Sequence, residues 1–78
     1  MTKIGYGLPK VSDVRIDIFN LMGETVATVV DEKSKKPGYY HSSWNSTNDL
    51  GVPVAAGIYI YQIRAGDFIK SRKLILLK

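Results

Sequence analysis

The stretch Asp13–Asn20, DVRIDIFN, decides the fold, because polar and apolar side chains alternate along it. Successive side chains of a β-strand point to opposite faces of a sheet. The alternation therefore predicts a strand with one buried face and one solvated face. The two sets are Val14, Ile16 and Ile18 on the buried side, and Asp13, Arg15 and Asp17 on the solvated side.

The segments on either side behave similarly, and no helical periodicity is present. Turn and loop signals recur at short intervals, at residues 20–23, 31–38, 45–51 and 65–67. The strands predicted between them are residues 3–8, 13–20, 24–30, 39–44, 52–55, 58–64 and 68–77, with 52–55 as a short edge strand. Six or seven short strands predict an all-β chain, a small antiparallel immunoglobulin-like β-sandwich in which successive strands pair as hairpins.

Apolar residues in the later strands indicate which faces are covered. If Trp44 points inward, Tyr40 and Ser42 share its face and His41 points outward. The strands at 58–64 and 68–77 carry apolar residues on both faces. The first is therefore expected to be a central strand covered on most of its area, and the last strand is expected to need cover on both sides. The opposed sets are Tyr59, Tyr61 and Ile63 against Ile58 and Ile60, and Leu74 and Leu76 against Ile75 and Leu77.

Length and composition limit the class of protein. The chain has 78 residues, which allows one small domain spanning residues 1–78. It has no cysteine, so its core must come from apolar packing. No apolar run approaches the roughly 18 residues that cross a bilayer, and membrane insertion is not expected. An initial methionine followed at once by strand-like residues suggests a piece excised from a larger secreted protein, which the parent gene would test.

The net charge of +4 raises the question of nucleic-acid binding. The basic residues do not alternate with exposed aromatic residues, as a base-stacking surface requires. Lysines on strand edges more often discourage sheets from pairing edge to edge. Nucleic acid is therefore not an expected partner. The basic residues form a loop cluster of Lys33, Lys35 and Lys36, and a terminal set of Lys70, Arg72, Lys73 and Lys78.

No catalytic site can be assembled from these residues. His41 is the only histidine, and the adjacent Ser42 points to the opposite face of a strand. The two side chains cannot act together as base and nucleophile. We therefore expect neither an enzyme nor a cofactor.

The loop at 45–51 is a weak candidate for a calcium site. Asn45, Thr47 and Asp49 have the alternate spacing of calcium-loop ligands, and Gly51 follows them. Only one of the three carries a charge, so a loop held by Asx turns is the favoured interpretation and no metal is expected.

Aromatic residues leave a further alternative open. Their planes could stack on sugar rings and form a carbohydrate-binding face. The other interpretation is that Trp44 and about half of the tyrosines form the core. The residues concerned are Trp44, Tyr39, Tyr40, Tyr59 and Tyr61.

A set of motifs occurs in order along nearly the whole chain, at residues 2–4, 8–9, 14–20, 21–26, 38–41, Trp44, 57–61 and 73–78. Together these motifs resemble the type A C-terminal sorting domain of the type IX secretion system. They are also similar to the related immunoglobulin-like domain of the flagellar hook-capping protein. The chain departs from the family where Asn45-Ser46 follows the tryptophan, since Asp-Gly is common there.

The resemblance implies a non-catalytic domain at the end of a larger secreted protein. Such domains direct an N-terminal cargo domain through the periplasm and a secretion apparatus to the cell surface or medium, and many are cleaved off after export. The family's signal elements are a glycine-containing segment before the penultimate strand and a basic-then-apolar final strand. With the neighbouring Arg72, the recognition residues implied here are Gly57, Tyr59, Tyr61, Arg72, Lys73, Leu74, Leu76 and Lys78.

Two functions remain open at this point. In the first, secretion-apparatus proteins read the terminal strand and its basic residues, by edge pairing and charge. In the second, the sandwich is an accessory linker, adhesion or carbohydrate-binding module of a surface enzyme, and its terminus matters only for folding.

Overall fold

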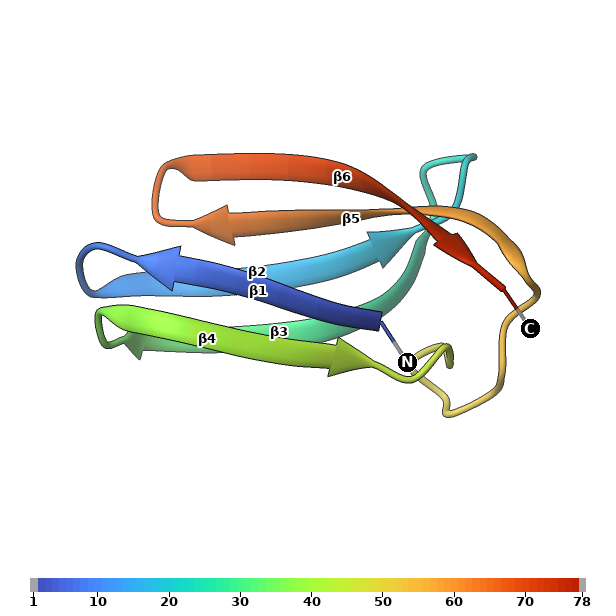
Figure 1. Ribbon diagram of the computed structural model, residues 1–78, viewed down its shortest axis with the longest axis horizontal. Coiled ribbons are helices and arrows are strands. Elements are labelled where there is room, and N and C mark those ends of the chain that lie inside the picture. Colours follow the sequence, from blue (N-terminus) through green and yellow to red (C-terminus); the bar gives the residue numbers. More distant parts are fainter. Residues whose placement is uncertain (1, 78) are drawn as a thin grey trace.

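The computed structural model describes residues 2–77, which form six β-strands and contain no helix (Figure 1). Since this part of the chain has no helix, none in it can span a membrane. All strand pairs are antiparallel, so the predicted all-β class is confirmed. The strands are β1 (Thr2–Leu8), β2 (Ser12–Phe19), β3 (Thr25–Lys35), β4 (Gly38–Trp44), β5 (Gly57–Ala65) and β6 (Phe68–Leu76).

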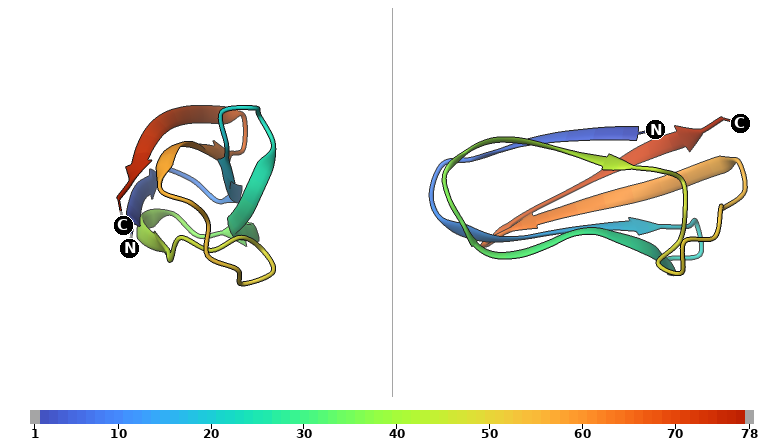
Figure 2. Two further views of the ribbon diagram at one scale, coloured as in Figure 1. Left: turned by 90° about the vertical axis from the view of Figure 1, so that its right-hand side faces the viewer. Right: turned by 90° about the horizontal axis from the view of Figure 1, so that it is seen from below.

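The strands form two sheets of unequal size. One has the order β3-β2-β5-β6, and the other contains β1 and β4. A view along the long axis shows the two sheets enclosing a common interior (Figure 2). The molecule measures 36 Å along its longest axis and 20 Å along each of the others. This is the predicted small sandwich, with six strands and a narrow second sheet.

The expected pairing of successive strands is wrong for β1. Among the strands of residues 2–77, only β2–β3 and β5–β6 pair as hairpins, whereas β1 pairs with β4. Gly5 lies opposite His41 and Gly7 opposite Tyr39 in this pair. A Cβ added at Gly7 would lie only 3.0 Å from the Tyr39 ring. The absence of a side chain at Gly7 therefore leaves room for the Tyr39 ring of β4.

The core is built on the stretch that alternates most clearly. Val14, Ile16 and Ile18 are fully buried, because β2 lies between β3 and β5 and the smaller sheet covers its inner face. Trp44 packs edge-on against Tyr59, with ring centroids 5.5 Å apart. The other buried apolar residues are Ile4, Leu8, Ala27, Val30, Ile63, Leu74 and Leu76.

Asp17 departs from the predicted alternation. It was expected on the solvated face, yet it is only 8% exposed. Its carboxylate accepts hydrogen bonds from Arg15 Nε at 3.0 Å and from the Thr28 hydroxyl at 2.8 Å. A buried carboxylate is tolerated when it is paired and hydrogen-bonded. The bond to Asp17, together with its charge, raises the pKa of Arg15 above its ordinary value.

Two predicted boundaries are also wrong. Residues 31–35, expected as part of a charged loop, continue β3, because they pair with the first half of β2. Residues 52–55, expected as a short edge strand, make only an isolated bridge between Thr47 and Pro53. Proline has no N–H to donate, so it cannot extend a ladder.

The predicted turn between β2 and β3 is confirmed. The amide of Gly23 donates to the Asn20 carbonyl at 3.1 Å, and Gly23 has a φ of +82°. The side-chain oxygen of Asn20 accepts from the amides of Met22 and Glu24, at 2.9 and 3.0 Å. The turn is thus stabilised by the Asn20 side chain and by the left-handed backbone of Gly23.

Gly23→Ala is expected to lower the free energy of unfolding by about 1–2 kcal/mol, because a Cβ is disfavoured in left-handed backbone. No atom lies within 4 Å of the new Cβ, so the loss comes from the backbone alone. Urea denaturation followed by circular dichroism measures it. Gly5→Ala, in an extended strand, should cost far less. Equal losses would show that turn geometry is not the cause.

Candidate functional site

The β5–β6 hairpin brings together the residues that the sequence singled out for recognition. In its register, Gly57 lies opposite Leu76, Tyr59 opposite Leu74, and Tyr61 opposite Arg72. Directly opposite side chains of an antiparallel pair are close neighbours on one face of the sheet. Lys78, the remaining member of that set, lies outside the described residues.

Burial divides these residues into two groups. Tyr59, Leu74 and Leu76 belong to the core, and the Tyr59 hydroxyl donates to the Ala55 carbonyl at 2.6 Å. Buried side chains are inaccessible to a partner while the domain stays folded, so these three act through the fold. The accessible members are Gly57, Arg72 and Lys73, together with the half-buried Tyr61.

The last strand is not covered on both sides, contrary to expectation. Ile75 is 61% exposed and Leu77 is 83% exposed, whereas Leu74 and Leu76 are buried. The smaller sheet covers only the inner face of the larger one. Residues 68–73 are exposed on both faces, because the narrow second sheet does not extend over the first half of β6. Only the second half of β6 closes the core.

The exposed half of β6 carries a basic edge, defined here as Lys70, Arg72 and Lys73. Within residues 2–77, none of these side chains forms an ion pair. The acidic partners all lie on β2 and β3, where they neutralise basic residues of those same strands. The pairs are Arg15 with Asp17 and Asp31, Lys33 with Asp13, and Lys35 with Glu32.

A groove lies beside this edge and separates β6 from β1. This side groove has a volume of about 410 Å³. Tyr61, Ile63 and Ala65 of β5 contribute apolar surface to it. Residues 5–8 of β1 line one side, and Phe68, Lys70 and Arg72 of β6 line the other. Basic side chains therefore stand at the margin of an apolar depression.

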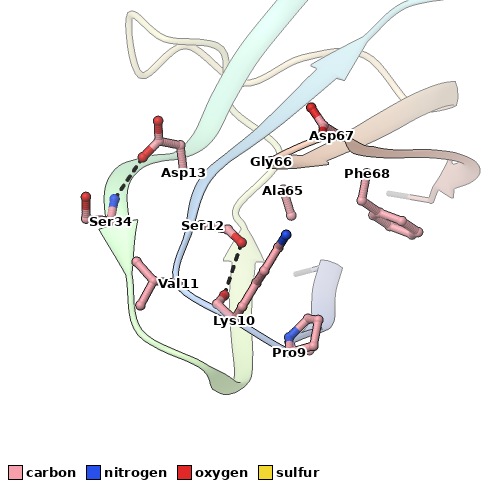
Figure 3. Close-up of a pocket in the computed structure, with 11 residues that line it drawn as sticks. Pro9, Lys10, Val11, Ser12, Asp13, Ser34, Ala65, Gly66, Asp67 and Phe68 are labelled. Carbon is pink, nitrogen blue, oxygen red and sulfur yellow. Dashed lines mark hydrogen bonds between the residues drawn. The ribbon is translucent and has the colours of Figure 1, made fainter.

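A second depression continues the side groove to the end of the molecule opposite the termini. This tip pocket, of about 750 Å³, shares Gly7, Ala65 and Phe68 with the side groove. Figure 3 shows Lys10 and Phe68 among the residues around it, with Ser12 donating to the Lys10 carbonyl at 3.1 Å. Together the two depressions follow the free side of β6 from its middle to the β5–β6 turn.

The oxygens of the candidate calcium loop are used to hold the loop itself. The Asn48 side chain accepts from the amides of Leu50 and Val52, at 2.9 and 3.0 Å, which is an Asx turn. Asp49 accepts from the Thr28 amide at 2.9 Å, and the Thr47 hydroxyl donates to the Asn45 side chain. Within residues 2–77, no cluster of three acidic, histidine or cysteine side chains could hold a metal ion.

The aromatic residues do not form a flat exposed platform. Trp44 is only 3% exposed, and its indole N–H donates to the Thr47 carbonyl at 2.8 Å. Tyr6 and Tyr40 stack with centroids 5.5 Å apart, but both are half-buried. Tyr39 is 93% exposed and lies over Gly7 on the outer face of β4. The tryptophan on which a sugar-binding face would depend is therefore part of the core.

Phe68 and Lys70 line the side groove but were not predicted from the sequence as residues of this site. Both lie on the same face of β6 as Arg72, opposite Ala65 and Ile63. Their alternate spacing with Arg72 was a usable signal. The contribution of β1 to the groove had no such signal, because it depends on pairing between distant segments.

Comparisons of the chain with protein-family models, with curated proteins and with solved structures find no match.

Proposed function

We propose that this chain is a non-catalytic C-terminal sorting domain of the type IX secretion system. It directs an attached N-terminal cargo domain through the periplasm and the secretion apparatus, to the cell surface or the medium. The ordered motifs between residues 2 and 78 support this proposal, as does the position of the last strand. An edge strand is open to a partner, whereas a central strand is not.

The observation that carries the proposal is the unneutralised basic edge on the terminal strand. Leu74 and Leu76 account for the apolar half of the strand, since they complete the core. Folding does not account for Arg72 and Lys73, which are exposed and form no ion pair within residues 2–77. Exposed charges contribute little to stability but steer association with a partner of opposite charge.

The test is export of a cargo protein fused to the chain, in a host with a working type IX apparatus. Arg72→Glu combined with Lys73→Glu is expected to reduce export by about tenfold or more, because both charges are reversed at the partner surface. The matched control is Lys33→Glu with Lys36→Glu, which changes the net charge equally but on β3 and on the connection between β3 and β4. That control should be exported normally.

Unchanged export of the Arg72 and Lys73 variant, with a folded domain, would refute the sorting proposal and favour an accessory structural or adhesion module. Circular dichroism and thermal unfolding of both variants establish that they fold. Deleting residues 73–78 is a weaker test, because it also removes Leu74 and Leu76 from the core. Charge reversal separates recognition from folding, whereas deletion does not.

A further inference from the structure

We propose that the free edge of β6 binds an extended strand of its partner, in which acidic and apolar residues alternate. The added strand lies along the side groove, its carboxylates facing Lys70 and Arg72. This inference rests on the proposed sorting function and specifies the chemistry of the partner that would read the terminal strand.

The backbone of β6 is available for such pairing. Among the described strands, β6 pairs with β5 alone and β1 pairs with β4 alone. Each therefore presents an unpaired edge, and the side groove lies between them. An exposed edge offers a row of unpaired N–H and C=O groups to another strand. β1 does not pair with that edge of β6, since the side groove separates the two strands.

The side chains of β6 define what the added strand must carry. On the groove side they are Lys70 and Arg72, neither of which has an acidic partner within residues 2–77. On the outer side, Ile69 is 57% exposed and Ile75 is 61% exposed, with Ser71 and Lys73 between them on the same face. Directly opposite residues of antiparallel strands interact, and opposite charges or paired apolar side chains are favourable. Alternating acidic and β-branched residues meet both requirements.

A second copy of this chain is the less suitable occupant. Two β6 edges paired with each other would bring together Lys70, Arg72 and Lys73 from both molecules. Like charges on facing strands are destabilising, and basic residues on edges commonly prevent this kind of association. The charge of the edge therefore favours a complementary acidic strand over self-pairing.

The experiment uses an acetylated and amidated peptide of alternating glutamate and valine as the probe, with the ¹⁵N-labelled chain. NMR titration is expected to show binding, with shifts concentrated on β6 and on the groove residues of β1. Alternate amides of β6 should exchange more slowly in the complex, since an added strand pairs with every second residue. Added salt should weaken binding.

Lys70→Glu with Arg72→Glu is expected to raise the dissociation constant of the glutamate peptide by about tenfold or more. Lys33→Glu with Lys36→Glu is the control of equal charge and should leave binding within about twofold. Two further peptides test the mechanism: one has lysine in place of glutamate, and the other is N-methylated at alternate valines. Both should bind much more weakly than the original peptide.

Three results would each overturn the inference. They are failure of the glutamate peptide to bind, equal binding of the N-methylated peptide, and a dimer of this chain formed through β6.

The export experiment tests the proposed function separately. If the peptide binds but the Arg72 and Lys73 variant is exported normally, strand binding along the groove is supported and the sorting proposal is refuted. If export is lost but no peptide binds, the sorting function stands and strand addition is wrong.

Discussion

Trp44→Ala is expected to lower the free energy of unfolding by about 3–5 kcal/mol, because it leaves a large cavity in the core. The indole is 3% exposed, packs against Tyr59, and donates its N–H to the Thr47 carbonyl. A domain of this length has a total stability of roughly 4–12 kcal/mol, so a large part of it would be lost. Urea denaturation followed by circular dichroism measures the change without relying on tryptophan fluorescence.

Tyr39→Ala is the matched control for this variant. It removes a large aromatic side chain from the same strand, but Tyr39 is 93% exposed. Its effect should stay within about 0.5 kcal/mol, as for most surface substitutions. A similar loss in both variants would contradict the assignment of Trp44 to the core. A stable Trp44→Ala variant that lost sugar binding would return the carbohydrate-binding alternative to consideration.

Leu74→Ala is expected to lower the free energy of unfolding by about 2–5 kcal/mol, whereas Leu77→Ala should have almost no effect. Both leucines belong to the final apolar run, but Leu74 is buried opposite Tyr59 and Leu77 is 83% exposed. Equilibrium unfolding of the two variants, measured side by side, gives the comparison. Equal losses would mean that the last strand is covered on both faces after all.

The Leu74 variant also provides the folding control for the export experiment. Its export should fall because the terminal strand no longer holds its place in the sheet, and its unfolding temperature should fall as well. The Arg72 and Lys73 variant should lose export while its unfolding temperature is nearly unchanged, since exposed charges contribute little to stability. Export loss with and without loss of stability thus separates the two roles of β6.

The sequence predicted most of the local structure. Alternation of Val14, Ile16 and Ile18 placed the central strand and its buried face, and Gly23 placed the turn after it. The same period predicted that Leu74 and Leu76 share one face of the last strand, but it left open whether Trp44 points inward. These features are local, since a strand's alternation and a turn's backbone depend on adjacent residues.

Predictions failed where distant segments decide the environment. Asp17 was expected in solvent, but Thr28 of β3 and the side chain of Arg15 enclose its carboxylate. Ile75 was expected under cover, but the second sheet lies only on the inner face. β1 was expected beside β2, yet it pairs with β4. None of these outcomes can be read from residues nearby in the chain.

The candidate site shows the same division. The sequence alone determined that the last strand is basic and then apolar, and that its apolar half has a face to bury, because period-two alternation is a property of the strand itself. The tertiary structure decided that β6 lies at the edge of its sheet, that Lys70 and Arg72 form no ion pair within residues 2–77, and that a groove separates β6 from β1. These depend on which strands pair and on how far a two-stranded sheet can cover a four-stranded one, which are long-range interactions between segments far apart in the sequence.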